Sequence, residues 1–168
     1  MSLLRRVHPF ILIAPLVLAA LWGCPPEREG AAGVIDGDTI VIGGTHIRLH
    51  GIDAPEREQH CRNAQGASYP CGQIAAARLR QELKGNKVAC DARYYDVYGR
   101  EVATCTVAGQ DLGDVMVRAG WAVDYSRYSN GKYRAAELEA RTERRGLWAG
   151  TFEEPWRWRE QHPRQAGR

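Results

Sequence analysis

The chain has 168 residues, 44% of them apolar, which suits one ordinary globular domain with its own core. Its formal net charge is +3, but residues 1–23 hold two arginines and no acid, so the remainder has 21 Lys and Arg against 20 Asp and Glu. This balance excludes binding of nucleic acid through bulk positive charge, and any such site must depend on local placement of charge.

Residues 1–23 have the pattern of a targeting segment. Two arginines precede an apolar run over residues 10–22, which is too short to span a bilayer and suits the hydrophobic region of a signal peptide. Cys24 follows a glycine, as in a bacterial lipobox, so the segment is predicted to be a lipoprotein signal with Cys24 lipidated. Ordinary secretion with cleavage nearby and an uncleaved anchor are the alternatives. We expect an exported protein, either a periplasmic or cell-envelope lipoprotein or a secreted one, that meets the membrane only through a lipid anchor.

Export favours disulfides among the other four cysteines, which allow three pairings. We favour Cys61–Cys71, which closes a short loop, and Cys90–Cys105, which would join two strands of a hairpin. Counting back from a turn with a glycine bulge places Cys105 opposite Asp91 instead, so the second pair needs a further bulge or a different turn. Buried reduced thiols are the alternative. A zinc site is not supported, because the spacings include no CxxC pair.

The first elements predicted after the signal are a polar linker over 24–32 and a β-hairpin. A strand begins at Val34, is interrupted by a turn or bulge at 36–38 and resumes to residue 42, where Gly43-Gly44 is a two-residue hairpin signal. The return strand covers 45–52. Its alternation places two apolar side chains toward the core and the arginine between them, Arg48, on the other face.

Four carboxylates flank this hairpin: Asp36 and Asp38 where it begins, Asp53 and Glu56 where it ends. A hairpin brings its two ends together, so the acids are expected to meet beside Arg48. Carboxylate oxygens are the ligands of hard divalent cations, and a guanidinium binds phosphate oxygens in pairs. The pattern therefore predicts a divalent-cation site beside a phosphate-binding arginine, and phosphodiester hydrolysis as the chemistry.

The remaining expected elements are a helix over 72–84, strands over 87–92 and 100–107 joined by a turn at 95–99, a short helix capped by Asp111 and ended by Gly120, an extended piece at 121–124, a loop at 125–132, a helix over 133–145 and a polar tail. This order suits a small closed antiparallel sheet with helices on it, such as an OB-type barrel.

The chain resembles the staphylococcal nuclease (thermonuclease) family over residues 33–150. The motifs that carry the resemblance are VIDGDTI at 34–40, IRLHGIDAPE at 47–56, DVYGREVA at 96–103, DLGDVMVRAGWA at 111–122 and YRAAELEARTERRGLW at 133–148. Each motif alone is weak, but five in order are a strong signal. The resemblance implies an α+β fold, a five-stranded antiparallel OB-fold-type β-barrel with three helices, and a calcium-dependent nuclease that acts on DNA and RNA.

The resemblance also assigns a metal site. Asp38 and Asp53 match the carboxylates that bind Ca²⁺, and Ala54 stands where the family offers a backbone carbonyl, often from threonine. Because the carbonyl does not depend on the side chain, this departure matters little. Asp36 matches the neighbouring acid behind the ligands, and Glu56 matches the glutamate that orients or deprotonates the attacking water.

The same comparison assigns the substrate contacts. Arg48 and Arg100 match the two arginines on the phosphate, Tyr98 matches the tyrosine beside the scissile nucleotide, and Tyr128 falls where a base-side tyrosine is expected. Ser126 stands where a second tyrosine would be, so the base pocket is expected to differ. We expect Arg100 to face the same pocket as Arg48.

The predicted organisation is a signal over 1–23, the linker, a nuclease domain over 33–150 and a C-terminal tail over 151–168, in a chain that acts as a monomer. The predicted activity is low-specificity hydrolysis that leaves 3′-phosphate ends. The alternative is a non-catalytic OB-type module that binds nucleic acid or protein at the cell surface. It is disfavoured because every catalytic position that the resemblance maps is filled by a suitable residue.

Overall fold

The structure is a computed structural model that describes residues 27–163. The predicted signal segment and Cys24 lie outside the described residues, so their assignment stays a prediction. Within the described part, no helix is long and apolar enough to cross a membrane.

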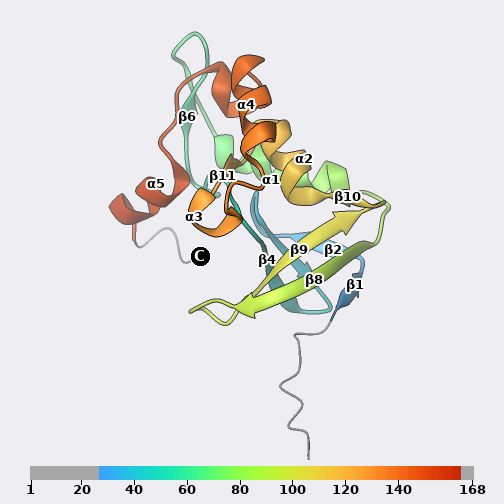
Figure 1. The fold of residues 1–168 in the computed structure, drawn as a ribbon. Helices are drawn as coiled ribbons and strands as arrows, with labels where there is room; N and C mark the ends of the chain where they lie inside the picture. The colour runs from blue at the N-terminus through green and yellow to red at the C-terminus, as the bar shows by residue number, and fades with distance from the viewer. Residues whose placement is uncertain (1–26, 164–168) are drawn as a thin grey trace, which may run out of the picture.

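The main sheet curls into a nearly closed barrel (Figure 1). Its strands pair in the order β1-β8-β9-β4-β3-β2, with β10 added to β9, and β4 and β9 run parallel whereas the other pairs are antiparallel. β1 and β2 are neighbours in the chain but lie at opposite ends of this order, which brings the two edges together. The bounds are β1 (Arg28–Gly30), β2 (Ala32–Val34), β3 (Thr39–Ile42), β4 (Thr45–Leu49), β8 (Val88–Tyr95), β9 (Glu101–Val107) and β10 (Gln110–Asp111).

The other elements gather at one end of the barrel (Figure 1). Two small sheets pair β5 (Ile52–Asp53) with β11 (Val123–Asp124) and β6 (Cys61–Arg62) with β7 (Ser68–Tyr69). The helices are α1 (Cys71–Leu83), α2 (Leu112–Arg118), α3 (Ser126–Ser129), α4 (Arg134–Thr142), the 3₁₀ helix η1 (Gly146–Ala149) and α5 (Pro155–Gln161).

This architecture confirms the predicted α+β fold of OB type, with more short elements than the expected five strands and three helices. Asp36–Asp38 is a turn between two separate strands, β2 and β3, rather than an interruption within one strand. The described part of the expected linker is not a plain linker, because β1 pairs with β8 and Arg28 donates two hydrogen bonds of 2.6 Å to buried Glu101. The segment expected to be a polar tail, residues 151–168, contains the helix α5.

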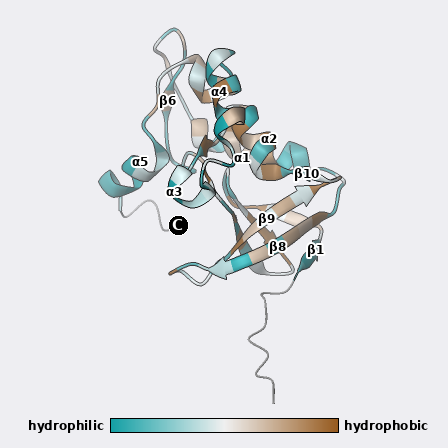
Figure 2. Cartoon of the chain, viewed as in Figure 1, coloured by the Kyte–Doolittle hydropathy of each residue, from teal (hydrophilic) through white to brown (hydrophobic). Residues whose placement is uncertain are grey.

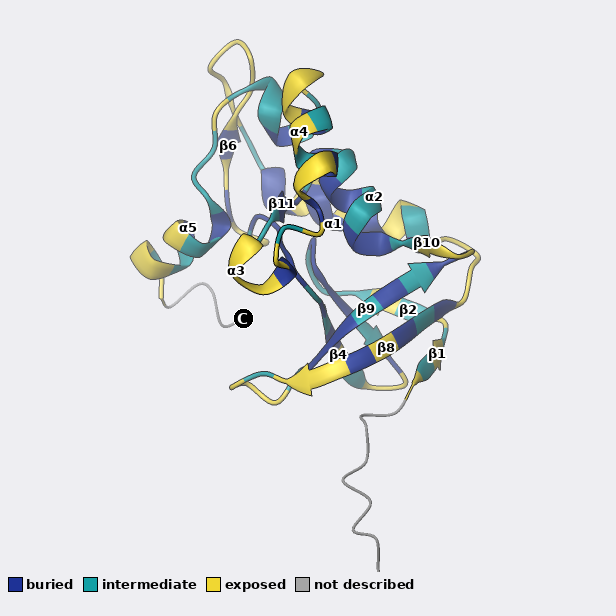
Figure 3. Cartoon of the chain, in the orientation of Figure 1, coloured by how far each residue is buried: buried dark blue, intermediate teal, exposed yellow. Residues whose placement is uncertain are grey.

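The core follows the alternation predicted for the hairpin. Ile47 and Leu49 of β4 are buried in one apolar cluster with residues of β3, α1 and α2. Figure 2 shows the apolar stretches of the strands and of α2 in brown, and Figure 3 shows buried stretches of the same elements in dark blue. Asp111 caps α2 as expected, since its carboxylate accepts hydrogen bonds from the N–H groups of Gly113 and Asp114.

Both favoured disulfides are present, Cys61–Cys71 and Cys90–Cys105. Cys90 lies directly opposite Cys105, because an irregularity in β8 between Ala92 and Tyr94 shifts the register by one residue. This is the further bulge that the residue count required.

Two glycines allow the acidic segments to approach α1. A Cβ on Gly72, in the first turn of α1, would lie 1.8 Å from the carbonyl oxygen of Glu56. A Cβ on Gly37, in the turn after β2, would lie 2.6 Å from the Cβ of Ala54. The backbone around Ala54 and Glu56 is therefore wedged between α1 and the turn, which fixes its position.

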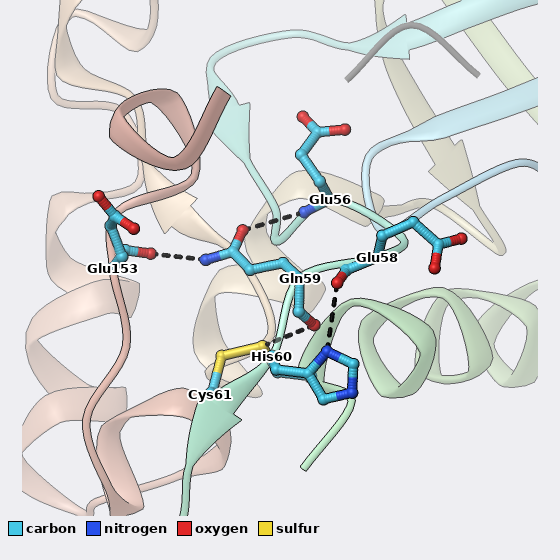
Figure 4. The surroundings of a disulfide bond; sticks show 7 residues. Glu56, Glu58, Gln59, His60, Cys61 and Glu153 are labelled. Carbon is cyan, nitrogen blue, oxygen red and sulfur yellow. Dashed lines mark hydrogen bonds between the residues drawn. A yellow bond between two sulfur atoms is a disulfide. The ribbon is translucent and has the colours of Figure 1, made fainter. Parts of the chain in front are cut away.

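Gln59 joins the loop after β5 to the C-terminal segment (Figure 4). Its side chain is fully buried; Oε1 accepts a hydrogen bond of 3.2 Å from the N–H of Glu56, and Nε2 donates one of 2.8 Å to the carbonyl of Glu153. Arg62 and Thr151 form a second link, a two-hydrogen-bond bridge. The segment before α5 is thus bound to the loop that carries Glu56.

Gly72→Ala is expected to destabilise the protein by about 1–3 kcal/mol, because the added methyl group overlaps a backbone carbonyl that cannot move freely. This loss outweighs the gain of about 1 kcal/mol that alanine brings to a helix. Denaturant unfolding measures the difference. Gly33→Ala is the control, since a Cβ there meets nothing within 4 Å. Equal stability of the two variants would contradict the wedged arrangement.

Gln59→Leu is expected to cost about 1–3 kcal/mol, because leucine fills the space but leaves the N–H of Glu56 and the carbonyl of Glu153 without their partner. Thermal or denaturant unfolding gives the value. Gln161→Leu makes the same change at an exposed glutamine on α5 and is expected to have little effect. If both variants unfold alike, the Gln59 bridge does not hold the two segments together.

Candidate active site

Arg48 lies between the two ends of the hairpin. β4 places its side chain off the core face; one terminal nitrogen, Nη1, donates a hydrogen bond of 2.7 Å to Oδ1 of Asp38, and the other, Nη2, donates one of 2.6 Å to Oδ1 of Asp53. Both carboxylates are almost fully buried, at 3% and 0% side-chain exposure. The predicted meeting of the acids with Arg48 is therefore present for these two residues.

The carboxylate of Asp38 is fixed by two further contacts. Its Oδ2 accepts the N–H of Ala54 at 2.9 Å, and its Oδ1 also accepts the hydroxyl of Thr39 at 3.1 Å. The N–H of Asp38 in turn donates to Oδ1 of Asp36 at 3.0 Å, which closes the turn between β2 and β3. The Asp36 carboxylate thus contacts the backbone of Asp38, and its predicted role behind the metal ligands stays a prediction.

A second guanidinium, Arg159 of α5, reaches the same carboxylates. Its Nη1 and Nη2 each lie 2.9 Å from an oxygen of Asp53, and Nη1 also donates to Oε1 of Glu56 at 2.8 Å. Asp53 therefore lies between two arginines. Glu56 faces Asp53 through the shared contact with Arg159, so the structure brings the predicted water activator next to a predicted metal ligand.

Burial dominates the electrostatics of this cluster. It raises the pKa of Asp53 and Glu56, and it raises the pKa of Asp36, which also faces the charge of a neighbouring carboxylate, to about 7. The arginine charges oppose the rise at Asp53 and Glu56. Burial also works against the charged form of Arg48, but its two aspartate partners outweigh this and raise its pKa, so it stays a cation at any working pH.

Arg100 is held at the tip of the β8–β9 hairpin. Its Nε donates a hydrogen bond of 2.8 Å to Asp96, and its guanidinium lies 5.4 Å from the ring centroid of Tyr98. Among the described residues it makes no hydrogen bond to the cluster around Arg48. The structure therefore keeps Arg100 and the exposed Tyr98 together but does not bring Arg100 onto the carboxylates, and its predicted role on the phosphate stays a prediction.

Tyr128 lies on α3 and forms an edge contact with Tyr125, at 4.9 Å between ring centroids. The ring of Tyr125 stacks on Trp156 of α5 at 5.4 Å, with an interplanar angle of 3°. Tyr128 is 46% exposed, so a face of this aromatic row is open to solvent. The exposed ring of Tyr128 is suited to base stacking, and its role at the base stays a prediction.

The donor set suits a hard divalent cation. Asp38, Asp53 and the carbonyl of Ala54 offer oxygen ligands from adjoining segments, which is the chemistry that Ca²⁺ prefers. Within residues 27–163, however, no three acidic, histidine or cysteine side chains converge closely enough to hold a metal ion. The aspartate oxygens instead accept hydrogen bonds from Arg48 and Arg159. The residues are thus of the type that binds a hard cation, but two guanidinium groups occupy their oxygens.

Sequence reasoning missed Arg159 and Gln59. Both residues lie outside the motifs that carry the resemblance. Arg159 lies on α5, which is mostly hydrophilic (Figure 2), so no hydropathy pattern indicates this helix. One signal was available. If Pro155 begins a helix, Arg159 lies on the same face four residues later and Trp158 beside it, and Pro155 and Trp158 are the buried residues of α5.

Comparisons with known proteins agree with this fold. The family described as "Staphylococcal nuclease homologue" matches residues 46–150. The chain is 36% identical over 139 residues to the "Succinoglycan biosynthesis protein ExoI" of Rhizobium meliloti (strain 1021), covering 82% of this chain and 73% of that protein.

Two fungal relatives carry the name "Probable endonuclease". That of Schizophyllum commune (strain H4-8 / FGSC 9210) is 36% identical over 121 residues, covering 62% of this chain and 40% of its own. That of Botryotinia fuckeliana (strain B05.10) is 31% identical over 140 residues, covering 77% and 51%. The chain thus spans about half the length of these two relatives or less. From the family match and the first relative, the chain belongs to the staphylococcal nuclease homologue family.

Proposed function

We propose that the protein is a nuclease that hydrolyses phosphodiester bonds of DNA and RNA with low sequence specificity and with Ca²⁺ as its cofactor. The observation that carries the proposal is the buried cluster in which Arg48 joins Asp38 to Asp53, and Arg159 joins Asp53 to Glu56. The family and the relatives named as endonucleases support the reaction class. Calcium, the breadth of substrate and the products rest on the resemblance alone.

Asp38, Asp53 and the carbonyl of Ala54 would hold the cation, which supplies positive charge beside the phosphate and lowers the pKa of a bound water. Arg48 stays charged and presents a flat pair of N–H donors to the phosphoryl oxygens, which gain negative charge in the transition state. Asp36 adds negative charge behind the ligands and fixes Asp38 through its backbone N–H.

Glu56 is suited to accept the proton of the attacking water. Its Oε1 accepts a hydrogen bond from Arg159, so Oε2 would be the oxygen that accepts the proton. Attack that expels the 5′ oxygen would leave 3′-phosphate ends. Tyr98 and Tyr128 would contact the sugar and base on either side of the bond, since both rings are exposed.

We also infer that the protein is exported. The predicted signal over 1–23 supports this, and so do the two disulfides, because disulfides persist in oxidising compartments and are rare in the cytosol. Lipidation at Cys24 would then hold the enzyme at the membrane. Metabolic labelling with palmitate, and its loss in Cys24→Ala, distinguishes a lipoprotein from a secreted protein.

Cleavage is expected to depend on calcium. Incubating the purified chain with plasmid, single-stranded DNA and RNA should give fragments with Ca²⁺ and none with EGTA, and end-labelling should detect 3′-phosphate. Glu56→Gln is expected to lower kcat by about 10² or more, because the amide cannot accept the proton. Binding of DNA without cleavage under any divalent cation would instead support the non-catalytic module.

Arg48→Gln and Arg100→Ala are each expected to lower kcat by about 10²–10³, the usual effect of removing one charged donor from the transition state. Arg93→Ala is the matched control, because Arg93 lies on the same hairpin as Arg100 and binds only Thr104 among the described residues. Unfolding midpoints verify that the variants are folded. If Arg100→Ala behaves like Arg93→Ala, Arg100 has no part in the reaction and the hairpin serves another purpose.

A further inference from the structure

Arg159 enters the site from a segment that the family match does not include. The match ends at residue 150, whereas α5 covers Pro155–Gln161. Arg159 nevertheless makes the paired contact with both oxygens of Asp53 and a third hydrogen bond to Glu56. A paired guanidinium–carboxylate contact of this kind is among the stronger hydrogen-bonded arrangements in proteins.

The position of α5 is fixed by contacts other than those of Arg159. Pro155 and Trp158 are buried, and Trp156 stacks on Tyr125 next to α3. The carbonyl of Glu153, just before the helix, accepts the amide of Gln59 (Figure 4). Arg159 is therefore held at the cluster by a docked helix, as Figure 1 shows for α5 beside α3, and is not a loose surface side chain that happens to reach an acid.

The contacts leave few free positions on the aspartates. Oδ1 of Asp53 accepts hydrogen bonds from both Arg48 and Arg159, which fills its two lone-pair positions, and Oδ2 accepts one more from Arg159. On Asp38, Oδ1 is filled by Arg48 and Thr39, but no contact there involves Arg159. Of the two guanidiniums, Arg159 is the one that lies between Asp53 and Glu56.

A divalent cation bound to Asp53 would meet the charge of Arg159 at close range. Two positive groups that share one buried carboxylate repel each other, and both need the same oxygens. Arg48 also bridges to Asp38 and is held within the barrel sheet, whereas Arg159 sits near the end of a seven-residue helix with 27% of its side chain exposed. Arg159 is thus the group that can withdraw.

We propose that Arg159 is the resident counter-cation of Asp53 and Glu56: a positioning residue that keeps these carboxylates together and that a divalent cation displaces from Asp53. The inference rests on the proposed function only in taking a divalent cation as the ligand of this site. It makes α5 a determinant of how tightly the site binds its metal, in addition to forming one wall of it.

Calcium titration of the full chain by isothermal calorimetry tests the proposal. Arg159→Gln is expected to lower the Kd for Ca²⁺ about tenfold, in the usual range for two ligands that oppose each other. Arg157→Gln is the matched control. It removes the same charge from the same helix, but Arg157 is exposed and pairs with Glu154 rather than with the cluster. Its Kd is expected to equal that of the wild type.

Metal-free stability gives a second readout. In EDTA, Arg159→Gln should unfold at a lower temperature than Arg157→Gln, because Asp53 and Glu56 lose their partner, and Ca²⁺ should raise its midpoint more than that of the wild type. If Arg159→Gln does not fold without metal, Arg159→Lys keeps the charge but not the paired contact, and its Kd should fall in the same direction by a smaller factor. A Kd that is unchanged or higher in the Arg159 variants would overturn the proposal.

This result is separable from the nuclease test, because neither readout requires cleavage. Tighter calcium binding by Arg159→Gln in a protein that cleaves no nucleic acid would uphold the inference and refute the proposed function. Calcium-dependent cleavage by the wild type, together with equal Kd values for all variants, would do the reverse. If the wild type binds no Ca²⁺, Arg159→Gln must gain binding, and its failure to do so counts against the proposal.

Discussion

The guanidinium of Arg48 is the contact on which the rest of the site depends. Asp38 and Asp53 come from opposite ends of the hairpin and are almost fully buried, so as neighbouring carboxylates they would repel each other. Arg48 lies between them and donates a hydrogen bond to each, so its positive charge offsets this repulsion in the interior. The pairing of β3 with β4 brings the two ends of the hairpin together, and Arg48 joins the acids that meet there.

The second constraint is steric. Gly37 lets the turn after β2 approach Ala54, and Gly72 lets α1 approach the backbone of Glu56. The disulfide from Cys71 ties the start of α1 to the end of the same loop, and Gln59 fixes the loop from its other side. Glu56 is thus positioned through its backbone as well as through the contact of its Oε1 with Arg159.

The sequence predicts the part of this arrangement that depends on local pattern. Period-two alternation placed Arg48 off the core face, and hairpin geometry placed Asp38 near Asp53, because both rules act over a few residues. The Cys90–Cys105 register was ambiguous, since a bulge at Ala92 shifts the pairing without a distinct composition. Arg159 could not be placed, because its contact with Asp53 spans 106 residues and depends on how a short hydrophilic helix docks. The role of Arg100 was assigned from the resemblance. In the structure its side chain donates a hydrogen bond to Asp96, a contact that none of the sequence rules used for the hairpin predicts.

The family match ends at residue 150, but the structure has no boundary there. Thr151 pairs with Arg62, Glu153 accepts the amide of Gln59 and Arg159 binds Asp53, so the segment contacts the loop after β5 at three successive points. These contacts add one positive charge to a buried group of acids, and a charge so placed changes the free energy of every other cation that binds there. Under the proposed function, the metal affinity of this site would therefore depend on the domain and its C-terminal helix together.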